Sequence, residues 1–96
     1  MRVVFRKRAE ADLGEIVEWY GTVAPDAIPR ILDDIYRAID LLIDFPRAGM
    51  PVPDTPFRRI VTRRYHFKIA YELGRNEVFI VGVFRFKTAR PEPRRA

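Results

Sequence analysis

The chain lacks several residue types on which common functional sites are built. Among its 96 residues there is no cysteine and no serine, and His66 is the only histidine. These absences exclude disulfide bridges, thiolate metal sites, a serine nucleophile and a multi-histidine zinc site. The five glycines are scattered and form no phosphate-binding loop. We therefore expect no cofactor, no metal ion and no ordinary nucleotide-binding or hydrolytic enzyme.

Long apolar runs are missing as well. No stretch reaches the roughly 18–20 residues that a membrane helix needs, and the apolar segment 3–5 is too short for a signal peptide. We expect a cytoplasmic protein with no membrane partner. The length and a hydrophobic content of 48% suit one small domain over residues 1–96. Its tail, residues 87–96, holds two prolines and four basic residues and is predicted to be flexible.

Apolar side chains recur with helical spacing twice in the first half of the chain. Leu13, Ile16 and Tyr20 begin one stripe, and a longer stripe predicts a second helix over about residues 27–45. The acidic residues of the second helix, Asp34 among them, are predicted to face away from the core. A short link between the two segments favours an antiparallel helix hairpin.

The second half of the chain follows the period of strands. Residues 57–62 read as a mixed strand, and apolar and polar residues alternate cleanly over 65–73. The run 78–84 is apolar on both faces, as in a central strand. Three prolines and a glycine in the loop 45–54 argue against regular structure there. The order is β-α-α-β-β-β, an α+β fold in which a helix hairpin packs on one face of a mainly antiparallel four-stranded sheet. The first strand, around 3–5, most simply pairs with the last.

A core follows from these faces. We expect the following residues to be buried: Leu13, Ile16, Val17, Tyr20, Ile35, Ile39, Leu42, Tyr65, Ile69, Ile80 and Phe84. The opposite sheet face should be less covered, and Lys68, with Arg59 or Arg63, is expected to project from it.

Charge divides the chain in two. Residues 1–54 hold ten acidic and seven basic residues, a net charge of −3, whereas residues 55–96 hold three acidic and eleven basic residues, a net charge of +8. The basic set on neighbouring strands and strand ends comprises Arg58, Arg59, Arg63, Arg64, Lys68, Arg85, Lys87 and Arg90. Such a set can hold phosphates, bind an acidic polypeptide or protect a sheet edge against pairing. His66 could act as a general base, but a lone histidine on the wetter side of a strand is usually a surface residue.

Several segments together resemble the RelE/ParE superfamily of toxins from toxin–antitoxin pairs. The matching pieces are Ala11-Asp12-Leu13, Ile16 and Trp19-Tyr20 in the first helix, Ala38-Ile39, Leu42, Phe45-Pro46 and Gly49 after the second, then residues 64–71 and 78–84. Their order and spacing cover nearly the whole chain, and the ParE-like branch is favoured. The resemblance implies a type II toxin that forms a hetero-oligomer with a cognate antitoxin. We expect the antitoxin to contact Trp19, Leu41, Arg58, Arg59 and Lys68.

The resemblance also bears on the target. In the RelE-like branch basic residues and a tyrosine or histidine after the last strand cut messenger RNA on the ribosome. Lys68, Arg85 and Lys87 match the basic positions, but the tyrosine and the histidine are missing. The ParE-like branch, which poisons DNA gyrase, fits better, and a nuclease is less expected. The C-terminal basic residues would then bind the target: Arg85, Lys87, Arg90, Arg94 and Arg95. A ribosome-dependent mRNA endoribonuclease and an inactive antitoxin-binding relative remain the alternatives.

Overall fold

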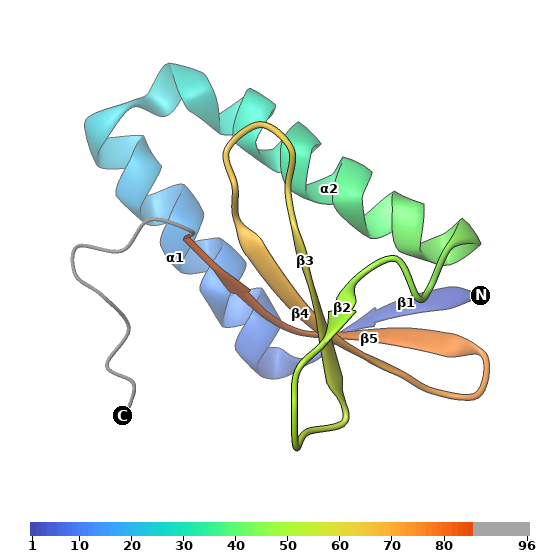
Figure 1. The fold of residues 1–96 in the computed structure, drawn as a ribbon. Helices are drawn as coiled ribbons and strands as arrows, with labels where there is room; N and C mark the ends of the chain where they lie inside the picture. The colour runs from blue at the N-terminus through green and yellow to red at the C-terminus, as the bar shows by residue number, and fades with distance from the viewer. Residues whose placement is uncertain (86–96) are drawn as a thin grey trace.

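Two helices cover one face of a five-stranded sheet in the computed structural model, which describes residues 1–85 (Figure 1). In chain order the elements are β1 (Arg2–Phe5), α1 (Lys7–Val23), the 3-10 helix η1 (Pro25–Ala27), α2 (Ile28–Asp44), β2 (Met50–Pro51), β3 (Phe57–Val61), β4 (Lys68–Leu73) and β5 (Glu77–Phe84). Neither α1 nor α2, nor any other helix in residues 1–85, is long and apolar enough to cross a membrane.

The sheet has the strand order β1-β5-β4-β3-β2. Strand β1 runs parallel to β5, which confirms the predicted pairing of the first strand with the last, and the other neighbours are antiparallel. The α+β class is as predicted, but the number of strands is not, because β2 lies in the loop that was expected to be irregular. Pro51 is tolerated in β2 because this short strand forms the sheet edge.

Tyr71 and Gly49 fix the position of that short strand. The Tyr71 hydroxyl donates to the carbonyl of Pro46 (2.7 Å) and accepts from the N–H of Gly49 (2.9 Å). A Cβ atom on Gly49 would lie 2.7 Å from both the Arg59 carbonyl oxygen and the Tyr71 hydroxyl. Only glycine permits this close approach, so a buried tyrosine and a glycine dock β2 on the sheet edge.

The core lies between the helices and the sheet. Six predicted core residues are buried: Ile16, Ile35, Ile39, Leu42, Ile69 and Ile80. Leu13, Tyr20 and Tyr65 are half-buried and pack against them. Two predictions are wrong, because Val17 is 37% and Phe84 40% exposed.

Both errors have a local cause. Helix α1 buries only Ala9 and Ile16, so its covered stripe is narrow and Val17 lies beside it. In the sheet, a register shift between Ala70 and Tyr71 inserts one extra residue into β5. This bulge reverses the faces of the residues that follow it. Val83 therefore enters the core, and Phe84 turns to the opposite face.

Candidate functional site

The sheet face away from the helices carries a groove with an apolar floor and a cationic rim. Its lining consists of Val52, Phe57, Arg59, Lys68, Ala70, Val81, Phe84 and Arg85. Arg59 lies opposite Ala70, and Lys68 lies opposite Phe84, so strand pairing brings these side chains to one face. Among the described residues that line the groove, none is a histidine, a tyrosine or a carboxylate. The groove can bind an anionic partner with apolar groups, and the side chains that its described lining offers are cationic or apolar.

Arginines from the start of the chain also reach aromatic rings of β5. The guanidinium carbon of Arg6 lies 4.7 Å from the ring centroid of Phe79, and that of Arg8 lies 5.7 Å from that of Phe84. Both distances allow cation–π attraction. Arginines from the acidic half of the chain therefore reach β5, where Arg6 also pairs with Glu72 and Arg8 with Asp12.

Trp19 borders this surface at the C-terminal end of α1. It is 46% exposed, and the guanidinium carbon of Arg85 lies 4.3 Å from its ring centroid. A second hollow, lined by Asp12, Glu15, Ile16, Trp19, Val83, Phe84 and Arg85, shares two residues with the groove. The structure thus brings Trp19, Arg59 and Lys68 onto one continuous surface.

Leu41 lies elsewhere. It borders a hollow between α2 and β3 together with Asp34, Arg37, Ala38, Ile60, Val61 and Arg63. A further hollow between Leu41 and the turn after α2 adds Phe45, which is 61% exposed. The residues predicted to contact the antitoxin are therefore divided between two surfaces.

Arg58 differs from its neighbour Arg59. Its guanidinium donates to the carbonyl oxygens of Gly49 (Nε–O 3.1 Å) and Arg47 (Nη2–O 3.3 Å). These bonds tie the turn before β2 to β3. Arg58 thus has a structural role beside any role in binding.

The residues matched to a nuclease centre are only partly described. Lys68 and Arg85 line the same groove, whereas Lys87 lies outside the described residues. The same holds for the predicted target-binding residues Arg90, Arg94 and Arg95. His66 lies in the turn between β3 and β4 with a φ of 62°, and it does not line the groove. Within residues 1–85 no group of three or more histidines and carboxylates is placed to hold a metal ion.

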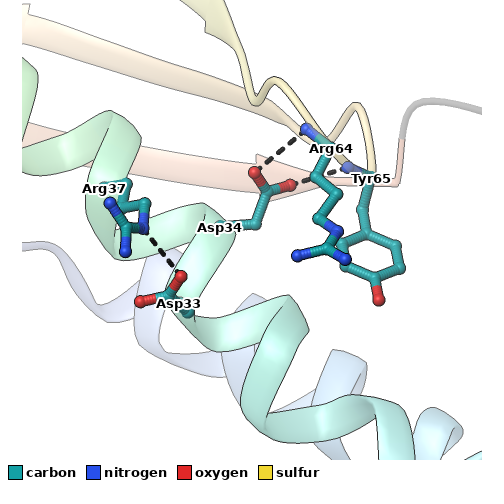
Figure 2. A network of polar contacts seen from close by, with 5 residues as sticks. All are labelled: Asp33, Asp34, Arg37, Arg64 and Tyr65. Carbon is teal, nitrogen blue, oxygen red and sulfur yellow. Dashed lines mark hydrogen bonds and ion pairs between the residues drawn. The ribbon is translucent and has the colours of Figure 1, made fainter.

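Asp34 lies in a different place from the one predicted from the sequence (Figure 2). It is only 7% exposed, and its two carboxylate oxygens accept the backbone N–H groups of Arg64 (Oδ1, 3.0 Å) and Tyr65 (Oδ2, 2.7 Å). The prediction that it faces away from the core is therefore wrong. Its position three residues after Ile31 and directly before Ile35, both buried, was the available signal. A carboxylate on a buried stripe must find donors, and here the backbone supplies them.

The adjacent Asp33 does face outward. Its Oδ2 accepts from Nε of Arg37 at 2.7 Å, one helical turn along α2 (Figure 2). This hydrogen bond, followed by the charge of the carboxylate, raises the pKa of Arg37 above its usual value. The two neighbouring aspartates thus have different roles: Asp33 pairs on the helix surface, and Asp34 links α2 to the turn after β3.

Comparisons with known proteins agree with this architecture. The chain is a small α+β domain in which two helices cover a mixed sheet. A similar fold occurs in a solved structure described as the chromosomal ParDE toxin–antitoxin system from P. aeruginosa. The likeness has a TM-score of 0.78 and 22% sequence identity, and it covers 91% of this chain and 97% of that one. The family model of the ParE toxin of the parDE type II toxin–antitoxin system matches residues 3–90. The chain therefore belongs to the ParE toxin family, and this membership implies an antitoxin partner. The comparison with curated proteins gives no match.

Proposed function

We propose that this chain is a toxin that a cognate antitoxin neutralises in a hetero-oligomer, and that its target is DNA gyrase. Membership of the ParE toxin family supports the toxin role. A cytoplasmic location goes with a target of this kind. The groove on the uncovered sheet face is the candidate for binding in either complex.

The composition of the groove favours gyrase over messenger RNA as the target. Acid–base cleavage of RNA needs groups that release and accept protons, and arginine stays protonated throughout the physiological range. Lys68 and Arg85 provide charge in the groove, but no tyrosine follows Tyr71 in the sequence, and the single histidine, His66, does not line it. The absence of a histidine, a tyrosine and a carboxylate from the described lining of the groove is the observation that carries the proposal. The same cations keep ribosome-dependent RNA cleavage as the second candidate.

The antitoxin would bind across the surface that joins Trp19 to Arg59 and Lys68. An apolar side chain of the antitoxin would displace Arg85 from the Trp19 ring, and acidic residues would meet the rim of the groove. Leu41 would form a second contact at the α2–β3 hollow, reached by a segment that passes around the sheet edge. Arg58 would contribute less, because its guanidinium already bonds two carbonyl groups.

Expression of the chain in cells tests the choice of target. Growth arrest should be accompanied by DNA-damage signalling and by intact transcripts in primer extension. Truncation after Phe86, which removes Lys87, Arg90, Arg94 and Arg95, should abolish toxicity and leave antitoxin binding intact. Discrete, codon-positioned cuts that vanish in Lys68→Ala but persist in the surface control Arg75→Ala would instead establish the nuclease.

A further inference from the structure

Hydrogen bonds fix the turn between β3 and β4, residues 62–67, at its tip and at its base. Asp34 accepts the N–H groups of Arg64 and Tyr65, as described above (Figure 2). At the base, the Thr62 hydroxyl accepts from the N–H of Phe67 (2.9 Å), and the Thr62 N–H donates to the Phe67 carbonyl (2.8 Å). Both Thr62 and Phe67 are buried. We call this segment the basic turn.

The basic turn presents two adjacent arginines to solvent. Arg63 and Arg64 are exposed, and neither makes an ion pair with another residue of the described part of the chain. The Asp34 carboxylate accepts the backbone N–H of Arg64, so it orders the turn without occupying the Arg64 guanidinium group. Arg37 on α2 borders the same hollow as Arg63, but its guanidinium is paired with Asp33.

We propose that the basic turn contacts the phosphate backbone of duplex DNA and that Asp34 is the residue that positions it. Guanidinium groups bind phosphate oxygens in charge-assisted pairs. A turn that is already ordered loses little conformational freedom on binding, so each contact contributes more to affinity. The inference rests on the proposed function, because gyrase is a target that holds duplex DNA.

The chemistry of the turn distinguishes this partner from an acidic polypeptide. A protein partner needs apolar anchors, and the groove near Trp19 supplies them. The tip of the basic turn has none, since Phe67 is buried and Tyr65 is half-buried against the core. The exposed Leu41 and Val61 line the hollow that Arg63 borders and do not belong to the turn. Contact through charge alone matches the sequence-independent binding of a DNA backbone.

The first test is the salt dependence of binding to a fluorescent random-sequence duplex, measured by anisotropy. Each phosphate contact contributes roughly 0.9 to the slope of log K against log salt, so Arg63→Ala/Arg64→Ala should lower the slope by about 1.8. Arg47→Ala/Arg75→Ala removes two exposed charges outside the basic turn and should leave the slope nearly unchanged. Equal slopes for the two double variants would overturn the proposal.

The second test sets positioning against charge. Asp34→Asn and Asp33→Asn each remove one negative charge, which by itself strengthens binding to a polyanion. In Asp34→Asn the new amide can accept only through its single carbonyl oxygen, so the turn loses order and DNA binding should weaken by about three- to tenfold. Asp33→Asn should bind as tightly as the parent chain or more tightly. Asp34→Asn binding at least as tightly as Asp33→Asn would refute the role of Asp34.

The controls keep this inference separate from the proposed function. Circular dichroism establishes whether Asp34→Asn is folded; if it is not, the salt slopes of the arginine variants decide alone. Gyrase inhibition without DNA binding by the purified chain would refute the basic turn and leave the target standing. DNA binding without gyrase inhibition would refute the target and leave the turn standing.

Discussion

The outer surface of α2 and the uncovered face of the sheet use charge in opposite ways. On α2, Asp33 and Arg37 pair with each other one turn apart and are both well exposed, an arrangement that contributes little to stability. On the sheet, cations surround an apolar floor, and Arg85 rests on Trp19. The difference teaches that a charged residue contributes to binding where it lies beside exposed apolar area, because apolar area anchors a partner.

The contrast also shows that the division of charge along the sequence is not a division of charge in the folded molecule. The first half of the chain is acidic overall, yet Arg6 and Arg8 from that half lie on aromatic rings of β5. Folding therefore gathers cations from both halves on the sheet side. Four predictions sharpen or break this comparison, beginning with the largest effect.

Adjacent leucines separate the core from the surface. Leu42 is fully buried, whereas Leu41 is 43% exposed on the same helix. Leu42→Ala should lower the free energy of unfolding by about 2–5 kcal/mol, and Leu41→Ala by less than about 1 kcal/mol. Urea denaturation measures both. Similar losses for the two variants would mean that α2 packs in a different orientation.

Two exposed aromatic residues separate the two surfaces. Trp19→Ala should weaken antitoxin binding by about 2 kcal/mol or more, close to thirtyfold, because it removes the apolar anchor beside the groove. Tyr36 on α2 is exposed to a similar degree, and Tyr36→Ala should have little effect. Isothermal titration with the cognate antitoxin measures both affinities. An intact affinity in Trp19→Ala would move the antitoxin off this face.

The two aspartates of Figure 2 should differ in stability as well as in DNA binding. Asp34→Asn leaves one part-buried backbone N–H without its acceptor, which costs about 1 kcal/mol or more. Asp33→Asn breaks an exposed contact within the helix and should leave the unfolding midpoint nearly unchanged. Thermal unfolding of both variants checks the difference. Equal midpoints would show that the turn does not depend on the carboxylate.

The smallest effect is expected at the rim of the groove. Arg59→Ala should weaken antitoxin binding by only about 0–1 kcal/mol, since exposed ion pairs are screened by solvent. The loss should shrink further as salt is raised. Titrations at two salt concentrations test this. A loss larger than that of Trp19→Ala would reverse the division between anchor and rim.

Sequence periodicity predicted the fold because the apolar stripes are long and regular. Ile35, Ile39 and Leu42 mark one face of α2 without ambiguity. The apolar run of β5 identified an interior strand, but the predicted central position belongs to β4. The short strand β2 was not predicted because its two residues, Met50 and Pro51, are too few to show an alternating pattern. Its position depends on hydrogen bonds from Tyr71, more than twenty residues along the chain.

The candidate site was harder to predict for the same physical reason. Its cationic member Lys68 follows from the alternation along one strand, whereas the mixed pattern of residues 57–62 allowed either Arg59 or Arg63 on this face. Phe84 joins them only because of a bulge, which no pattern within β5 reveals. Asp34 looked like a surface residue because its partners, the N–H groups of Arg64 and Tyr65, lie about thirty residues away. Whether the named residues bind antitoxin or target stays a prediction.

Supercoiling of relaxed plasmid by purified gyrase tests the central claim most directly. The chain should inhibit supercoiling in proportion to its concentration, and the cognate antitoxin should restore it. Truncation after Phe86 should abolish the inhibition while the shortened chain still binds antitoxin. Full supercoiling at saturating concentrations of the intact chain, together with ribosome-dependent cuts in messenger RNA, would contradict the account.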